Sequence, residues 1–114
     1  MIRYASFYGC QIPMRLPSIE IASRKVFEKL GIEAVDLPGY SCCPEPVISR
    51  LLDKTAWLVT SARNLALAEE RGLDIMTLCN GCYETLVETN HVLKHEPEEL
   101  QKINEILRQY GREY

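Results

Sequence analysis

The sequence predicts an α/β domain, built on a small and mostly parallel sheet of three or more strands flanked by helices. Short apolar runs alternate along the chain with longer segments whose apolar residues recur at helical spacing. Glycines stand where the longer segments end. The cysteines follow the apolar runs, so the cysteine-bearing loops are expected together at the carboxyl edge of the sheet, where functional groups gather in open parallel sheets.

The first half of the chain should form two strands joined by a helix. Residues 2–8 are a short apolar run, and Pro17 then opens a helix that ends before Gly31. The apolar residues that recur at helical spacing in this segment are Ile19, Ala22, Val26, Phe27 and Leu30. Residues 33–37 form the second strand, which Pro38 and Gly39 end.

The second half should contain one strand and most of the helical residues. A short helix is expected over residues 47–52, and Asp53 is placed to cap a long helix that runs to about Arg71. The packing side chains expected on this helix are Trp57, Leu58, Ala62, Leu65 and Ala66. The remaining elements are a strand over residues 74–78, a helix over residues 81–95, and a last helix from Pro97 to about Tyr110.

All five cysteines of the chain fall into one pattern. They are Cys10, the adjacent pair Cys42-Cys43, and the Cys79-x-x-Cys82 motif. An odd number of thiols cannot all pair within one chain, and a bridge between neighbouring cysteines is sterically awkward. A C-x-x-C motif joined by distant cysteines is how proteins gather thiolates around soft metals. The sequence therefore predicts a metal–sulfur centre, with iron–sulfur ahead of zinc.

The number of cysteines leaves several forms of such a centre open. Four thiolates complete a tetrahedral zinc site or a cubane cluster, so the fifth is either idle or part of a larger or less regular centre. The simplest alternative makes Cys10 and one of the pair ordinary buried thiols. Thioredoxin-like dithiol chemistry at Cys79-x-x-Cys82 would leave the other three cysteines without a use. The helix start at Cys82 favours a thiolate there.

Three separated segments resemble the cysteine-rich CCG domain, and most closely the first such domain of the heterodisulfide reductase B subunit. The segments are Phe7-Tyr8-Gly9-Cys10-Gln11-Ile12-Pro13, Ser41-Cys42-Cys43-Pro44 and Leu78-Cys79-Asn80-Gly81-Cys82-Tyr83, joined by Ala62-Arg63-Asn64. The resemblance covers essentially the whole chain, as a single domain over residues 1–114. It implies that the five cysteines hold a noncubane [4Fe-4S] iron–sulfur centre. Pro44 stands where the family name has a glycine.

The resemblance also implies a function. We expect an oxidoreductase component: an iron–sulfur redox subunit, or half-subunit, of a heterodisulfide-reductase-like complex that transfers electrons to a disulfide or cleaves it. The B subunit carries two CCG domains and this chain has cysteines for one. The implied partners are therefore a second CCG domain, a ferredoxin-like C-type subunit and a flavin subunit. The alternatives are an electron-transfer domain of another CCG-containing dehydrogenase and a zinc-stabilised interaction module.

Composition limits the other function classes. The formal net charge of −3 does not favour nucleic-acid binding, which calls for a basic face. No apolar run approaches the ~20 residues of a membrane span, and the start of the chain has no signal-peptide character. Reduced thiols in this number predict a cytoplasmic protein. The chain also has no Gly-rich phosphate loop and no G-x-S-x-G motif.

Two further sets of side chains are weaker candidates for the site. The arginines that are candidates for an anionic substrate or a neighbouring cluster are Arg15, Arg50 and Arg63. The tyrosines placed near a cysteine, where they would shield a cluster from water, are Tyr8, Tyr40 and Tyr83.

Overall fold

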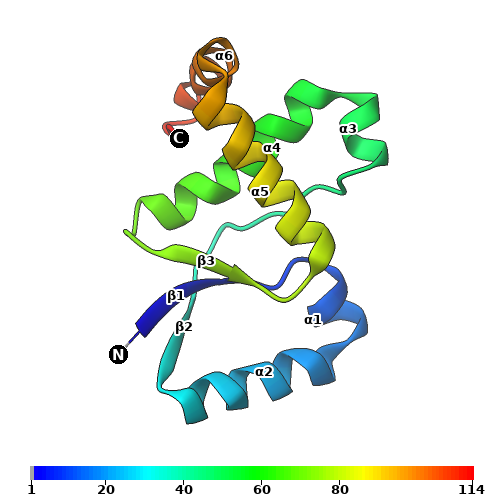
Figure 1. The fold of residues 1–114 in the computed structure, drawn as a ribbon, viewed down its shortest axis with the longest axis vertical. Coiled ribbons are helices and arrows are strands. Elements are labelled where there is room, and N and C mark those ends of the chain that lie inside the picture. The colour runs from blue at the N-terminus through cyan, green and yellow to red at the C-terminus, as the bar shows by residue number, and fades with distance from the viewer. Residues whose placement is uncertain (1) are drawn as a thin grey trace.

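The computed structural model describes residues 2–114, so Met1 of the predicted domain lies outside the described residues. It confirms an α/β fold with a parallel three-stranded sheet (Figure 1). The elements in chain order are β1 (Ile2–Phe7), α1 (Gln11–Arg15), α2 (Pro17–Leu30), β2 (Ile32–Asp36), α3 (Ile48–Leu52), α4 (Lys54–Glu69), β3 (Asp74–Thr77), α5 (Asn80–His95) and α6 (Pro97–Arg108).

The sheet aligns the carboxyl ends of its strands. The strand order is β2-β1-β3, with β1 in the centre. Ser6 of β1 pairs in register with Asp36, the last residue of β2. Phe7, the last residue of β1, pairs with Thr77, the last residue of β3. The three following segments therefore start side by side along one edge, as parallel pairing requires.

The helices form two unequal layers on the sheet. Helices α4, α5 and α6 pack together on one side, and α2 lies on the other (Figure 1). The core of the first layer joins all three of its helices. Its fully buried large side chains are Trp57, Leu58, Leu93, Ile103 and Leu107. Within residues 2–114 no helix is both long and apolar enough to cross a membrane.

Helix α4 forms as the sequence predicts. The carboxylate of Asp53 accepts a hydrogen bond from the backbone N–H of Ala56 at 3.0 Å, which caps the helix. Four of the five expected packing residues are buried, and Leu65 is partly buried against the sheet. At the far end of α4, Glu70 accepts two hydrogen bonds from Arg112, at 2.7 and 2.9 Å, which fasten the C-terminal segment.

Helix α1 is not expected from the sequence. It is only five residues long and contains Pro13, which indicates a break. Pro13 lies in the first turn of the helix, where the backbone N–H has no partner within the helix, so a proline is tolerated. The chain therefore turns into a helix directly after Cys10.

Helix α2 has the predicted bounds but not the burial that its apolar residues suggest. None of its residues Pro17–Leu30 is buried, and Val26 and Leu30 are 52% and 68% exposed. Its polar side chains lie against the sheet instead. The guanidinium of Arg24 donates two hydrogen bonds to the Asp36 carboxylate of β2, both at 3.0 Å. Most of the predicted apolar stripe is therefore exposed, and only Phe27 of its five residues is half-buried.

Candidate metal–sulfur centre

The structure brings all five predicted cysteines to the carboxyl edge of the sheet. Cys10 follows β1 and precedes α1, Cys42 and Cys43 lie in the loop after β2, and Cys79 and Cys82 lie at the start of α5. All five are free thiols with graded exposure. Cys10 and Cys42 are exposed, Cys79 is half-buried, and Cys43 and Cys82 are buried.

The five thiols form one continuous series of neighbours. Cys42 interacts with Cys10 on one side and with Cys43 on the other. Cys43 and Cys82 pack in one buried cluster, and Cys79 packs against that cluster. Within residues 2–114 no three cysteine, histidine, aspartate or glutamate side chains are already arranged to hold a metal ion. The series is thus a set of adjacent soft donors and not a closed coordination shell.

The pKa values of the two buried thiols, Cys43 and Cys82, are shifted in opposite directions. Hydrogen bonds from Cys82 first, and then from Cys42, lower the pKa of Cys43 to about 6 although burial opposes the shift. The hydrogen bond to Cys43, burial and the charge of Cys43 together raise the pKa of Cys82. Burial raises the pKa of Cys42 to about 11. Of the three thiols whose pKa is shifted, Cys43 is thus the one whose thiolate is favoured by its neighbours, whereas the pKa of Cys82 is raised although it lies at a helix start.

Gly9 lets the loop after β1 lie directly on Cys82. Its φ of +72° is a left-handed conformation that glycine adopts freely. A Cβ at this position would lie 2.7 Å from the Sγ atom of Cys82, which is closer than nonbonded atoms approach. The space beside Cys82 therefore requires glycine here for two independent reasons.

A buried amide on α4 holds the loop that carries Cys42 and Cys43. Asn64 is 0% exposed. Its Oδ1 atom accepts hydrogen bonds from the backbone N–H and the hydroxyl of Ser41, at 3.1 and 3.3 Å. Its Nδ2 atom donates to the carbonyl of Cys42 at 3.2 Å. One side chain thus fixes the backbone on the N-terminal side of the cysteine pair.

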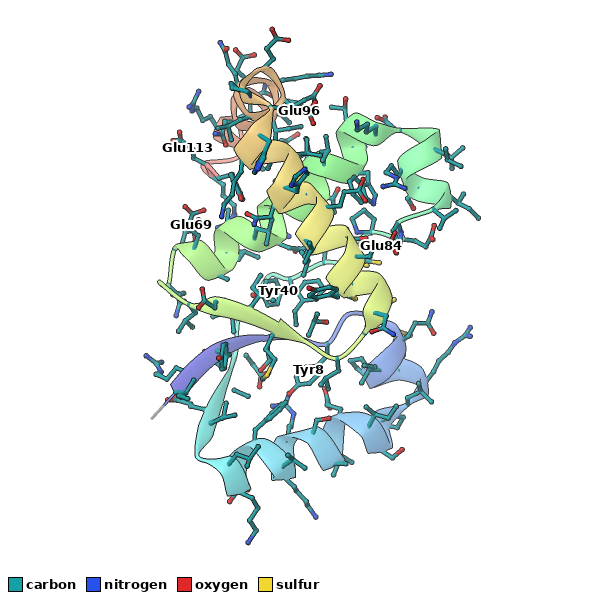
Figure 2. All side chains as sticks on the ribbon, viewed as in Figure 1. Tyr8, Tyr40, Glu69, Glu84, Glu96 and Glu113 are labelled. Atoms are coloured by element: carbon teal, nitrogen blue, oxygen red, sulfur yellow. The ribbon has the colours of Figure 1, made fainter. Side chains whose placement is uncertain are left out.

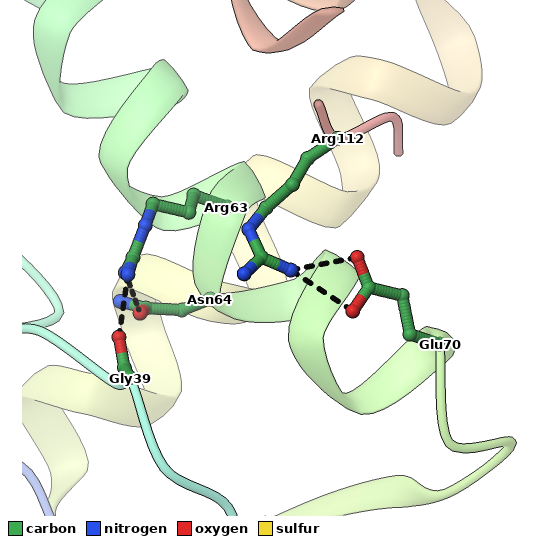
Figure 3. A network of polar contacts seen from close by, with 5 residues as sticks. All are labelled: Gly39, Arg63, Asn64, Glu70 and Arg112. Atoms are coloured by element: carbon green, nitrogen blue, oxygen red, sulfur yellow. Dashed lines mark hydrogen bonds and ion pairs between the residues drawn. The ribbon is translucent and has the colours of Figure 1, made fainter. Parts of the chain in front are cut away.

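Two more contacts fix the rest of this loop. Arg63 donates a hydrogen bond of 2.6 Å to the carbonyl of Gly39, next to Asn64 (Figure 3). On the other side of the pair, the hydroxyl of Thr85 on α5 donates to the carbonyl of Pro44 at 2.8 Å. The Glu45 carboxylate then accepts hydrogen bonds from backbone N–H groups at the start of α3. Helices α4 and α5 therefore position the cysteine pair.

These anchoring residues are what sequence reasoning missed. The sequence singles out Asn64 only through the family resemblance, offers Arg63 as a candidate for an anion and not as an anchor, and gives Thr85 no role. The available signal was the presence of polar residues, Asn64 among them, between the apolar packing positions of the segment that forms α4.

The three candidate arginines differ in their side-chain partners. Arg63 is committed to the loop, and Arg50 pairs with Glu88 at 2.6 Å and lies 5.5 Å over the ring of Trp57. Of the three, Arg15 alone makes no side-chain hydrogen bond or ion pair with residues 2–114. It is the candidate that stays free for an external anion.

Of the three tyrosines near a cysteine, two are in place to shield the site. Tyr8 lies toward α2 and Tyr40 toward α5, as Figure 2 shows. The ring of Tyr40 packs edge-on against Phe7 at 4.8 Å, and burial raises its pKa to about 12. The ring of Tyr8 lies 4.8 Å under the guanidinium of Arg24. Tyr83 is 62% exposed, so it does not exclude water.

Comparison with known proteins agrees with this arrangement. A family model described as "Cysteine-rich domain", the CCG family, matches residues 4–87, which include all five thiols. The chain belongs to the CCG cysteine-rich domain family. The predicted family is therefore confirmed by a match that spans most of the chain.

The relatives of this CCG chain are longer proteins. It is 45% identical, over its whole length, to the B subunit of the Ferredoxin/F(420)H(2)-dependent CoB-CoM heterodisulfide reductase of Methanosarcina acetivorans. It is also 45% identical to a protein of Archaeoglobus profundus described as similar to the heterodisulfide reductase B subunit, and it spans 38% of the length of each. A crystal structure of a hypothetical protein from Helicobacter pylori superposes with a TM-score of 0.85 at 25% identity, covering 98% of this chain and 22% of the other.

Proposed function

We propose that Cys10, Cys42, Cys43, Cys79 and Cys82 hold an iron–sulfur cluster of the noncubane [4Fe-4S] type. The observation that carries this proposal is the position of all five thiols after the ends of three parallel strands, at one edge of the sheet. Thiolates are the ligands that iron–sulfur clusters take. The donor set and the glycine that clears space beside Cys82 fit such a cluster.

The residues of the chain divide the work of holding the cluster. The five thiolates would bind it, and when bound it would supply transfer of one electron at a time. Asn64 and Thr85 orient the loop that presents Cys42 and Cys43. Phe7 and Leu86 pack with Cys43 and Cys82 and exclude water from the inner side. The outer side, at Cys10 and Cys42, stays open.

The function that fits this site is that of a redox subunit, or half-subunit, of a heterodisulfide-reductase-like complex. A disulfide takes up two electrons and two protons and gives two thiols. Electrons are proposed to come from a ferredoxin-like C-type subunit and a flavin subunit, and a second CCG domain is proposed to contribute a second centre. The 45% identity to heterodisulfide reductase B subunits over the whole chain supports this proposal.

The surface around the cysteine loop suits docking of such partners. Helix α3, which directly follows the loop, exposes apolar side chains in place of polar ones. These side chains are Val47, Ile48, Leu51 and Leu52, between 56% and 82% exposed. Exposed apolar patches of this kind mark interaction sites. A single domain over residues 1–114 and a cytoplasmic location remain predictions.

Two alternatives use the same cysteines. Family membership does not separate the chain from an electron-transfer domain of another CCG-containing dehydrogenase, because the two share the domain. A zinc-stabilised interaction module would use four of the thiols in a structural site. Acid-labile sulfide distinguishes the redox proposals from the zinc module, and the partners that co-purify distinguish the two redox proposals.

Serine substitutions test the proposal. Replacing Cys42 or Cys43 by serine, one at a time, should abolish or convert the centre, because both thiols are proposed ligands. Iron content and the EPR spectrum of protein purified without oxygen are the measurements. Iron content and a spectrum that stay the same in either variant would contradict the five-ligand centre.

A further inference from the structure

A cavity of about 410 Å³ lies beside the exposed end of the thiol series, and apart from its two cysteines its polar wall has no part in the function described so far. Its walls come from the carboxyl ends of β1 and β2, from α1 and α2, and from the cysteine loop. Cys10 and Cys42 both line it. Its volume is within the range of small-molecule sites in proteins.

The wall that α2 contributes is polar and fixed. Glu20 and Arg24 line the cavity, whereas Ile19, Val26 and Leu30 of this helix are exposed to solvent. Arg24 is held by two hydrogen bonds of 3.0 Å to Asp36 and lies 3.7 Å from Glu20. Its guanidinium also covers the ring of Tyr8 at 4.8 Å. Because α2 places these charged side chains toward the sheet, the space between them is a polar cavity and not an apolar core.

Two residues of this cavity that are buried as a whole, Ser6 and Tyr8, have hydroxyls without a partner among residues 2–114, as has the half-buried Tyr40. Ser6 is 4% exposed and Tyr8 is 9% exposed, and both line the cavity. Neither hydroxyl hydrogen bonds to any group among residues 2–114. Leaving a buried hydroxyl unpaired costs about 1–3 kcal/mol, so native structures rarely contain one without a bound partner. Unlike the unpaired hydroxyls of Ser61 and Thr89 in the helical layer, these two line a cavity, so a polar ligand bound there would satisfy both.

The charges around the cavity restrict what that ligand is. Two carboxylates, of Glu20 and Asp36, and one guanidinium, of Arg24, leave one net negative charge. This balance does not attract a strongly anionic group such as a sulfonate or a phosphate. It suits a head group that carries both signs: an ammonium meets the carboxylates, while carboxylate or amide oxygens accept from the two hydroxyls and from Arg24.

We propose that this cavity binds the head group of a zwitterionic thiol compound of the amino-acid type, or of its disulfide, with the sulfur toward Cys10 and Cys42. The inference rests on the proposed function only for the placement of the ligand's sulfur toward Cys10 and Cys42. The binding of the head group depends on Ser6, Tyr8 and Arg24, and not on the cluster.

Calorimetric titration with S-methylcysteine tests this site. The thioether keeps the zwitterionic head and cannot exchange with free thiols, so the measured heat reports binding alone. We expect saturable binding to protein purified without oxygen. Tyr8→Phe and Ser6→Ala should each weaken that binding about three- to tenfold, the effect of one lost hydrogen bond. Tyr83→Phe is the matched control, because this exposed tyrosine lies next to Cys82 but not in the cavity, and it should bind as the wild type does.

Three results would overturn the proposal: no binding to the wild type, equal affinities for the Tyr8→Phe and Tyr83→Phe proteins, or tighter binding of 2-(methylthio)ethanesulfonate than of S-methylcysteine. If Tyr8→Phe does not fold, as judged by circular dichroism, Ser6→Ala decides. Iron and sulfide are measured on the same samples. Their absence with S-methylcysteine bound contradicts the proposed function and leaves this site standing, whereas the reverse pattern removes this site alone.

Discussion

The two faces of the sheet have opposite character. On one face, α4, α5 and α6 enclose an apolar core with Trp57, Leu93 and Ile103 fully buried. On the other face α2 contributes no buried residue over Pro17–Leu30, and it meets the sheet through a charged pair and a polar cavity. Burial of apolar surface is the main source of stability. The first face therefore stabilises the domain, and the second is free to carry chemistry.

The cysteine edge lies between these two faces and draws on both. Cys43 and Cys82 are packed into the apolar layer, whereas Cys10 and Cys42 open toward the polar side. A centre held in this way is shielded from one direction and accessible from the other. This comparison makes predictions that differ from one region to the next.

Removal of the metal should have the largest effect, and the effect should be local. With the cluster extracted, residues 38–46 and 79–83 should lose order, because ligand binding energy is folding energy in small metal domains. The core between α4 and α6 should stay protected. Amide hydrogen exchange before and after extraction measures both regions. Unchanged protection of the two cysteine segments would contradict the proposed ligation.

Replacing a leucine by alanine should destabilise the protein much more on the α5 face of the sheet than on the α2 face. Leu93→Ala on α5 should lower the free energy of unfolding by about 2–5 kcal/mol, because this side chain is 1% exposed in the core. Leu30→Ala on α2 should change it by less than about 0.5 kcal/mol, because this side chain is 68% exposed. Urea denaturation of both variants measures the difference. Similar losses would show that α2 is packed as tightly as α5.

Asn64→Ala should weaken the cysteine loop specifically. The variant loses the hydrogen bonds to Ser41 and Cys42, so the free energy of unfolding should fall by about 2–4 kcal/mol and iron content should fall with it. Asn104→Ala is the control. This amide is also buried, but it holds Tyr114 at the opposite end of the molecule. The control should lose stability and keep its iron; equal iron loss in both would argue against a specific role for Asn64.

Comparing alanine substitutions at Gly9 and Gly31 measures the effect of a steric clash with Cys82 separately from backbone strain. Gly9 and Gly31 have nearly the same φ, +72° and +74°, so an alanine costs a similar backbone strain of about 1 kcal/mol at either position. Only at Gly9 does the added Cβ meet the Sγ atom of Cys82. Gly9→Ala should therefore also lose iron, and Gly31→Ala should not. Metal analysis of the two variants is sufficient, and full iron in Gly9→Ala would show that the loop yields without disturbing Cys82.

Local signals in the sequence account for most of the fold. The cap at Asp53, the glycine after Leu30 and the prolines at the starts of α2 and α6 act through their nearest neighbours, and each predicted boundary lies within about two residues of the observed one. The same reasoning could not say which way α2 turns. That orientation depends on Asp36 and Tyr8, which lie elsewhere in the chain and hold Arg24.

The candidate site divides in the same way. The cysteines are predictable because thiols at the ends of successive parallel strands must meet at one edge. The anchors at Asn64 and Thr85 are not, because their partners are backbone carbonyls more than twenty residues away. The unpaired hydroxyls of Ser6 and Tyr8 become visible only when burial and hydrogen bonding are known for the folded chain.

The most direct test of the account is the content of iron, acid-labile sulfide and zinc per chain in protein purified without oxygen, together with its EPR spectrum. A cluster held by the five thiols predicts about four irons per chain with sulfide, and little zinc. Zinc alone, with no sulfide and no EPR signal, would contradict the redox centre and make four of the five thiols a structural zinc site.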